Sequence, residues 1–247
     1  MSIFDININD DSSLIKKWLE ENCDIYSDSF PNQYEIINNI VHINGTVTII
    51  NKDIEYIPIQ FGEVTGAFNC YGCKKLKSLE GSPYKVGRFD CSYCDSLINL
   101  KGGPREAKQY YCCNCSGLTS LKGGPNTCKV YFNCSECNDL KILDWVPEYM
   151  GEFNCSGCKS LTSLKGLPSF IYGDLNCCRC DSFKDMTGFP QVINGSLNCL
   201  FCNNLTSIEG ISSIVTGDIM ISRCNSLNIT KTDVIDKVYV KGRIYIN

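Results

Sequence analysis

The stretch VGRFDCSYCDSLINLKGGP, residues 86–104, decides the fold, because variants of it follow one another along most of the chain. The next copy is AKQYYCCNCSGLTSLKGGP, residues 107–125. The first cysteine of each copy, or the isoleucine that replaces it, recurs every 21 or 22 residues, at Cys70, Cys91, Cys112, Cys134, Cys155, Cys177, Cys199 and Ile221. A constant period of this length is typical of a solenoid, in which each repeat forms one turn of a coil.

Each copy also keeps the same apolar positions around its cysteines. An aromatic or aliphatic residue lies two positions before the first cysteine, at Phe68, Phe89, Tyr110, Phe132, Phe153, Leu175, Leu197 and Ile219. Residues two apart in a strand share a face, so Phe89 and Cys91 point into one core that stacked repeats enclose. Gly102 and Pro104 mark the return of the chain, where glycine permits a left-handed turn and proline needs no N–H donor.

The repeats resemble the leucine-rich repeat family. Residues 86–97 match its strand motif L-x-x-L-x-L-x-x-N/C-x-L, with Cys94 at the N/C position and Leu97 one residue further on than usual. Repeats written F-x-C-S-x-C-x-x-L-x-S-L-x-G-x-P are also similar to those of uncharacterised proteins of tailed bacteriophages and large DNA viruses. The resemblance covers roughly residues 41–228 and implies a viral or phage protein that acts in the host cytoplasm or is part of the virion.

We therefore predict a β-rich solenoid, a leucine-rich-repeat-like right-handed coil with one parallel strand per rung and about ten rungs. Residues 41–228 form the solenoid, residues 229–247 a C-terminal capping rung, and residues 1–40 an N-terminal cap. Within this cap, residues 12–22 place Leu14, Ile15, Trp18 and Leu19 on one stripe. This stripe predicts a short helix that covers the core at the open end of the coil.

Composition limits the functions that the chain can have. The 247 residues carry a net charge of −4, which argues against a general nucleic-acid or anionic-membrane surface. We expect no membrane-spanning helix, and the start MSIFDININDDSS lacks the basic and apolar parts of a signal peptide. His42 is the only histidine, and no nucleophile–base–acid set or phosphate-binding glycine motif is present. We therefore expect a protein that is not an enzyme and uses no cofactor.

The 19 cysteines permit three interpretations. Seven C-x-x-C pairs in register could form a string of metal sites, or the rungs could be linked by disulfides. Alternatively, the thiols are small side chains that fill a narrow core. Isoleucine takes the place of the first cysteine at Ile49, Ile221 and Ile246, an exchange that a metal ligand would not survive. Stacked side chains point side by side, which would strain a disulfide, so we predict free, buried thiols and no metal site.

The outward side of the strands carries the candidate binding residues. One column is mostly asparagine, and we expect its amides to hydrogen-bond from rung to rung. The neighbouring columns vary and include aromatic and arginine side chains, which dominate protein interfaces, although isolated surface aromatics occur on any protein. The candidate partner-binding residues are Tyr71, Arg88, Tyr93, Tyr111, Tyr131, Glu136, Trp145, Arg179, Phe201 and Arg223.

Trp145 is a candidate for a different reason, because it occupies a position that is glycine in six other repeats. If that position requires a positive φ, a tryptophan must distort the return segment and expose its ring on one edge of the solenoid. The alternative is that the ring packs across Pro147 or Tyr149.

Three functions are compatible with these features. The leading hypothesis is a non-enzymatic scaffold that binds a host or viral protein through the sheet face or one edge. The second is a structural component of a virion or its assembly, which associates with itself or with a capsid or tail protein. The third is a cysteine array loaded with metal.

Overall fold

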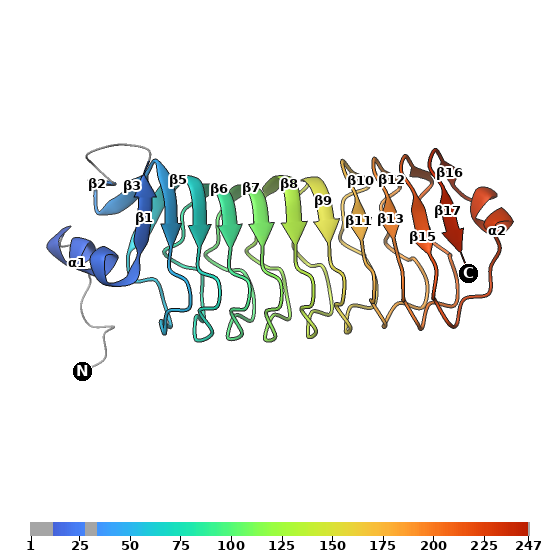
Figure 1. Ribbon diagram of the computed structural model, residues 1–247, viewed down its shortest axis with the longest axis horizontal. Coiled ribbons are helices and arrows are strands. Elements are labelled where there is room, and N and C mark those ends of the chain that lie inside the picture. Colours follow the sequence, from blue (N-terminus) through green and yellow to red (C-terminus); the bar gives the residue numbers. More distant parts are fainter. Residues whose placement is uncertain (1–11, 28–33, 247) are drawn as a thin grey trace.

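The computed structural model describes residues 12–27 and 34–246, which form a parallel β-solenoid of about nine turns (Figure 1). The predicted fold class is therefore confirmed. The strands of the main sheet lie side by side along the long axis, in the order β1-β4-β5-β6-β7-β8-β9-β11-β13-β15-β17. These strands are β1 (Asp24–Ser27), β4 (Gly45–Thr48), β5 (Gln60–Asn69), β6 (Lys85–Asp90), β7 (Glu106–Tyr111), β8 (Thr127–Asn133), β9 (Tyr149–Asn154), β11 (Leu175–Asn176), β13 (Leu197–Asn198), β15 (Ile219–Ile221) and β17 (Ile244–Ile246).

The later rungs contain a second sheet, because their strand segment is divided in two. This sheet has the order β10-β12-β14-β16 and consists of β10 (Phe170–Ile171), β12 (Val192–Ile193), β14 (Ile214–Val215) and β16 (Tyr239–Val240). Both sheets are parallel within this region. The rungs of β5 to β9 keep one longer strand of six to ten residues.

The core columns stack in the register that the repeat predicts. Pairing joins Phe68 to Phe89, Tyr110, Phe132 and Phe153 in turn, and then continues through Leu175, Leu197, Ile219 and Ile244. The five aromatic rings are buried, and neighbouring ring centroids lie 5.0–5.8 Å apart. Every rung thus covers the apolar face of the previous one.

The return segments use glycine as predicted. Gly102 and Gly123 have φ values of 86° and 87°, and the other return glycines, Gly81, Gly166, Gly188 and Gly210, also have positive φ. A second device fixes the same segments, because a short polar side chain accepts the N–H of the residue two positions further on. Its members are Ser78, Asn99, Ser120, Ser163, Asp185 and Ser207. In these six rungs the return is therefore closed by local hydrogen bonds as well as by stacking.

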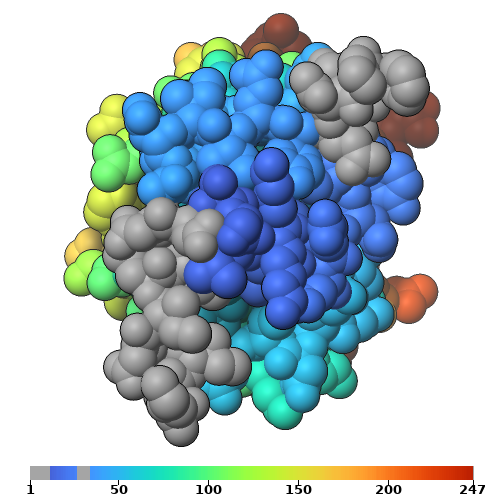
Figure 2. All heavy atoms as spheres, turned by 90° about the vertical axis from the view of Figure 1, so that its left-hand side faces the viewer, coloured from blue at the N-terminus to red at the C-terminus, as the bar shows by residue number. Residues whose placement is uncertain are grey.

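Different elements cover the two ends of the coil (Figure 1). At the N-terminal end, α1 (Ser12–Asn22) occupies the predicted range and buries Ile15 and Leu19. Figure 2 shows this helix lying across the end of the solenoid. Next to it, β1 pairs antiparallel with β4, and β2 (Glu35–Ile37) pairs antiparallel with β3 (Ile40–Ile43), which also pairs with β5.

The C-terminal end carries a helix that the sequence reading did not include. The helix α2 (Lys231–Ile235) buries Val234 and begins with a capping box, in which Thr230 and Asp233 each bond the other's backbone N–H. The pattern of threonine followed three residues later by an acidic residue is the sequence signal for this start.

Candidate functional site

The second cysteine of each pair has a structural role that repeats along the solenoid. Its thiol donates to the backbone carbonyl of the first-cysteine position in the preceding rung, as in Cys94 to Cys70 and Cys158 to Cys134, both at 3.2 Å. Five further thiols make the same contact at 3.1–3.3 Å, and Cys73 donates to the Ile49 carbonyl. An isoleucine at the first position preserves this contact because the acceptor belongs to the backbone.

Burial keeps the cysteine columns in the neutral thiol form. It raises the pKa of Cys199 to about 11 and that of Cys112 well above the ordinary range. It also raises the pKa of Cys128, a buried thiol outside the pairs, to about 12. Thiolate is the form that attacks electrophiles, so these groups are poor nucleophiles at neutral pH. Within residues 12–27 and 34–246, no three His, Cys, Asp or Glu side chains form a group that could hold a metal ion.

The C-x-x-C segment forms a tight turn after each strand, and its third residue adopts a left-handed conformation. These third residues define a row that we call the turn ridge: Gly72, Tyr93, Asn114, Glu136, Gly157, Arg179, Phe201 and Arg223, with φ between 55° and 72°. Tyr71, Tyr93, Glu136, Arg179, Phe201 and Arg223 were expected on the outward face of the strands. They lie in these turns instead, because the strand ends before the first cysteine.

The turn ridge brings several of the candidate residues into contact. Arg179 and Arg223 flank the Phe201 ring from the two adjacent rungs, with their guanidinium carbons 5.5 and 5.2 Å from its centroid. Near the other end of the ridge, Tyr71 and Tyr93 lie 5.0 Å apart between ring centroids. The side chain of Glu136 lies against Gly157 of the next rung. The ridge therefore has an arginine-rich end and a tyrosine end.

A second group of candidate residues lies on the strands themselves, and we call it the Tyr111 cluster: Arg88, Tyr111 and Tyr131. The Arg88 guanidinium lies over the Tyr111 ring at 4.4 Å and also pairs with the largely buried Asp90. The Tyr111 and Tyr131 centroids are 5.5 Å apart, and the Tyr131 hydroxyl accepts a hydrogen bond from the Asn154 amide. This cluster presents ordered aromatic and cationic groups to solvent.

The asparagine column is structural, but its hydrogen bonds differ from the expected ones. Each side-chain oxygen accepts the backbone N–H two residues further on in its own turn, as Asn133 does from Ser135 and Asn154 from Ser156. Asp90 does the same for Ser92. The expected rung-to-rung bonds between stacked amides are replaced by these local ones, because the tight turn brings the N–H within reach of the residue that precedes it.

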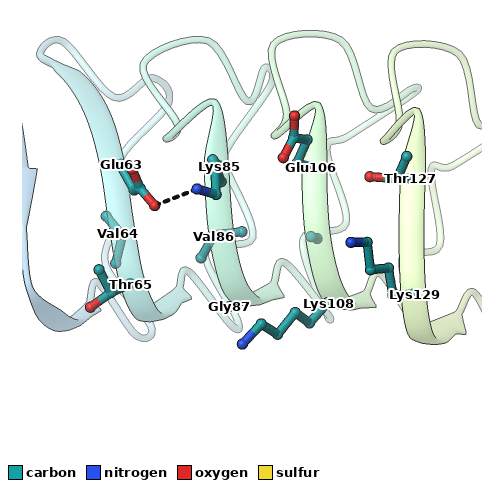
Figure 3. Close-up of a pocket in the computed structure, with 11 residues that line it drawn as sticks. Glu63, Val64, Thr65, Lys85, Val86, Gly87, Glu106, Lys108, Thr127 and Lys129 are labelled. Atoms are coloured by element: carbon teal, nitrogen blue, oxygen red, sulfur yellow. Dashed lines mark ion pairs between the residues drawn. The ribbon is translucent and has the colours of Figure 1, made fainter.

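A groove of about 300 Å³ crosses the first part of β5 to β8 (Figure 3). Its walls carry charges of both signs, and Lys85 pairs with Glu63 at 2.8 Å. Lys108 and Lys129 extend from neighbouring strands along its lower side. None of the candidate residues lines this groove. It is a mixed-charge surface.

Trp145 is exposed at 43% of its surface, as expected for a tryptophan at a glycine position. Trp145 lacks the positive φ of the return glycines. In its rung, the Asp144 side chain accepts a backbone N–H that a backbone carbonyl accepts in other rungs. The Asp144 carboxylate accepts the Leu121 N–H and the Ser120 hydroxyl. In other rungs a backbone carbonyl accepts the equivalent N–H; for example, the Lys122 carbonyl accepts the Leu100 N–H. The indole N–H of Trp145 donates to the Gly124 carbonyl at 2.9 Å, which fixes the ring.

Sequence reading missed a group of exposed aromatics beside Trp145. Tyr149 and Tyr172 stack at 4.4 Å between centroids, and Phe170 lies 4.5 Å from Tyr172. All three rings are substantially exposed. Their signal was present in the repeat alignment, where Tyr149 and Phe170 occupy a column that holds lysine, glutamate and threonine in the preceding rungs.

No family model, curated protein or solved structure matches the chain. Among the described helices, none is long and apolar enough to cross a membrane. The fold and the site together define a parallel β-solenoid whose turns are capped by buried thiols and whose ordered aromatic and arginine side chains face solvent.

Proposed function

We propose that this protein is a non-enzymatic scaffold that binds a host or viral protein through the turn ridge and the adjacent Tyr111 cluster. The repeat resemblance is our reason for assigning it to the leucine-rich-repeat-like proteins of phages or large DNA viruses. The same resemblance is our reason for placing its activity in the host cytoplasm or the virion.

The observation that carries the proposal is the choice of residues on the turn ridge. A left-handed backbone favours glycine and tolerates asparagine, and the chain uses Gly72, Gly157 and Asn114 at three of these positions. At the other positions it places tyrosine, glutamate, arginine, phenylalanine and arginine, each of which holds a strained conformation. Residues held in strain at the surface are a feature of binding sites, and aromatic and arginine side chains are the strongest anchors at interfaces.

The contacts within the ridge also suit it for binding. Because Arg179 and Arg223 stack on Phe201, these side chains are partly ordered before a partner arrives. Pre-ordering reduces the conformational entropy that association removes. The exposed guanidinium of Arg179 can also form paired hydrogen bonds with a carboxylate of the partner.

The experiment is a quantitative capture of partners from host or infected-cell lysate with the immobilised full chain. Arg179→Glu, Phe201→Asp, Tyr93→Ala and Tyr131→Ala test the ridge and the Tyr111 cluster, and Lys141→Glu on the return side is the matched charge control. We expect at least a tenfold loss of retained partner for the first two variants, as for central interface anchors, and no loss for the control. Full retention by all four variants, with unchanged melting temperatures, would exclude this surface.

A further inference from the structure

The rung that contains Trp145 departs from the repeat at three neighbouring positions. Ile142 replaces the serine, asparagine or aspartate that closes the return in other rungs, Trp145 replaces the glycine, and Asp144 supplies the missing acceptor through its side chain. Ile142 and Trp145 are both exposed. The fold does not require these exchanges, since six other rungs close with glycine at the Trp145 position.

These exchanges border an open groove of about 840 Å³, which we call the Trp145 groove and which is lined mainly by Asn126, Asp144, Trp145, Glu148, Tyr149 and Lys165. The aromatic surface continues beyond it, because Tyr149 stacks on Tyr172 and Tyr172 contacts Phe170. The groove lies at the start of β9, whereas the turn ridge follows the strand ends. It is therefore separate from the surface proposed above.

The geometry limits how a peptide could bind in this groove. The start of β9 is paired on both sides, because Tyr149 pairs with Thr127 of β8 and the Tyr172 N–H donates to the Met150 carbonyl. A peptide cannot add a strand where no strand edge is free. A polyproline II helix needs no such edge, because its backbone stays solvated and its proline rings dock in grooves lined by aromatic side chains.

Charge adds a second requirement for the peptide. The groove carries two exposed carboxylates, Asp144 and Glu148, against one ammonium group, Lys165. A peptide with an arginine or lysine beside its prolines would complement this balance. The Trp145 ring is already fixed by its bond to the Gly124 carbonyl, so little side-chain entropy is lost when a proline packs on it.

We propose that the Trp145 groove binds a proline-rich peptide segment that carries a basic residue and adopts the polyproline II conformation. The aromatic faces of Trp145 and Tyr149 contact the prolines, and Asp144 and Glu148 contact the basic side chain. The proposal does not depend on the turn ridge, so its failure leaves the proposed function of the ridge intact.

The test uses the full chain in a Trp18→Phe background, where Trp145 is the only tryptophan. A synthetic ten-residue peptide with a P-x-x-P core and one flanking arginine is titrated while Trp145 fluorescence is recorded. We expect a saturable change. A peptide with both core prolines replaced by alanine should bind at least tenfold more weakly, and a peptide with glutamate for arginine should also bind more weakly. Equal binding of the three peptides, or none, would overturn the proposal.

Variants of the protein locate the site, with binding measured by the anisotropy of a labelled peptide. Trp145→Gly restores the residue of the other rungs and should fold, but should lose at least tenfold in affinity, as expected for an aromatic anchor. Tyr149→Ala provides a second variant should the first one fold poorly, and Tyr84→Ala, an exposed tyrosine on another return, is the control. Unchanged affinity in both groove variants contradicts the proposal. Self-association abolished by Trp145→Gly would also contradict it, because a second copy would then occupy the groove.

Discussion

The two halves of the solenoid use the same repeat but build it differently. In the rungs of β6, β7 and β9, two residues separate the buried residue early in the strand from the core aromatic, as between Val86 and Phe89. In the rungs after β9, three residues separate the same two positions, as between Ile193 and Leu197. The first arrangement gives one continuous strand, and the second gives two short strands with a bend between them.

The comparison shows that the neighbours of an inserted residue decide its effect. The rung of β8 also contains the extra residue, but both strands that pair with it, β7 and β9, belong to shorter rungs. β8 remains continuous, with register shifts between Ala107 and Gln109 and between Cys128 and Tyr131. An isolated insertion is thus absorbed as a bulge. In the rungs after β9, consecutive insertions stack on one another, and the bend becomes a corner between two sheets.

The core changes with the backbone. Aromatic side chains fill the strand column from Phe68 to Phe153, whereas leucine and isoleucine fill it from Leu175 onward. In the rung of Leu175 the aromatic residue lies in another column: Phe183 occupies a position that is leucine in other rungs, and its ring packs edge-on against Phe189. In this rung the second ring offsets the smaller side chain in the strand column, as a close-packed interior requires.

The largest expected effect concerns the buried thiols that both halves share. Because their folded pKa values lie above the ordinary value of 9.0, the folded state retains protons that the unfolded chain releases. The stabilisation is complete below about pH 9 and declines as the pH rises toward 11–12, by about 1.4 kcal/mol per pH unit for each such thiol. Urea unfolding at pH 7.5, 9.0, 9.8 and 10.5 should show a steep loss of stability.

A cysteine variant separates this effect from the titration of tyrosine and lysine. Cys199→Val removes one buried thiol, so its stability should fall less steeply between pH 9 and 10.5 than that of the wild type. A wild-type stability that stays constant up to pH 10.5 would contradict the assigned role of burial. If spectroscopic probes in the two halves report the same unfolding transition at each pH, the two halves unfold as one unit.

The next effect tests the corner between the two sheets. A Cβ atom at Gly195 would lie 2.5–2.6 Å from the backbone of Gly173 in the preceding rung. Gly195→Ala should therefore reduce the free energy of unfolding by about 2–4 kcal/mol, since the backbone must shift. Most rungs of the continuous half have glycine at the matching place as well, for example Gly87, where a Cβ atom would lie 2.6–2.7 Å from two backbone oxygens of the preceding rung. The rung of Lys108 has a side chain there, so Lys108→Ala should change the free energy of unfolding by less than about 0.5 kcal/mol. Chemical denaturation measures both variants, and equal losses would show that the close approach at Gly195 does not require glycine.

A smaller effect is expected in the aromatic column. Tyr110 is the only tyrosine of this column, and its buried hydroxyl has no hydrogen-bond partner among the described residues. Tyr110→Phe should raise the free energy of unfolding by about 1 kcal/mol, because it removes an unsatisfied polar group. Phe132→Tyr supplies the reverse comparison and should lower it. A loss of stability in Tyr110→Phe would show that the hydroxyl is satisfied in solution.

Much of this structure follows from the periodicity of the sequence. The stacked columns, the return glycines, the helix at residues 12–22 and the exposed Trp145 were all predicted, because each depends on a repeated or local pattern. The division into two sheets was not, because it depends on whether neighbouring rungs share an insertion. The residues of the turn ridge were predicted to lie on the strands, because the alternation of side chains typical of a strand was assumed to continue past the first cysteine, such as Cys91. The chain already turns at this cysteine.

The central claim is that large side chains on the turn ridge are held in strain for binding, and Arg179 tests it most directly. The measurement is the free energy of unfolding of Arg179→Gly and Arg179→Ala, beside their affinity for a captured partner. Glycine fits a left-handed turn without strain, so Arg179→Gly should be more stable than Arg179→Ala by about 1 kcal/mol. It should also fold as stably as the wild type to within about 0.5 kcal/mol and bind the partner more weakly. An alanine variant as stable as the glycine variant, or a glycine variant that is markedly less stable than the wild type, would contradict the claim.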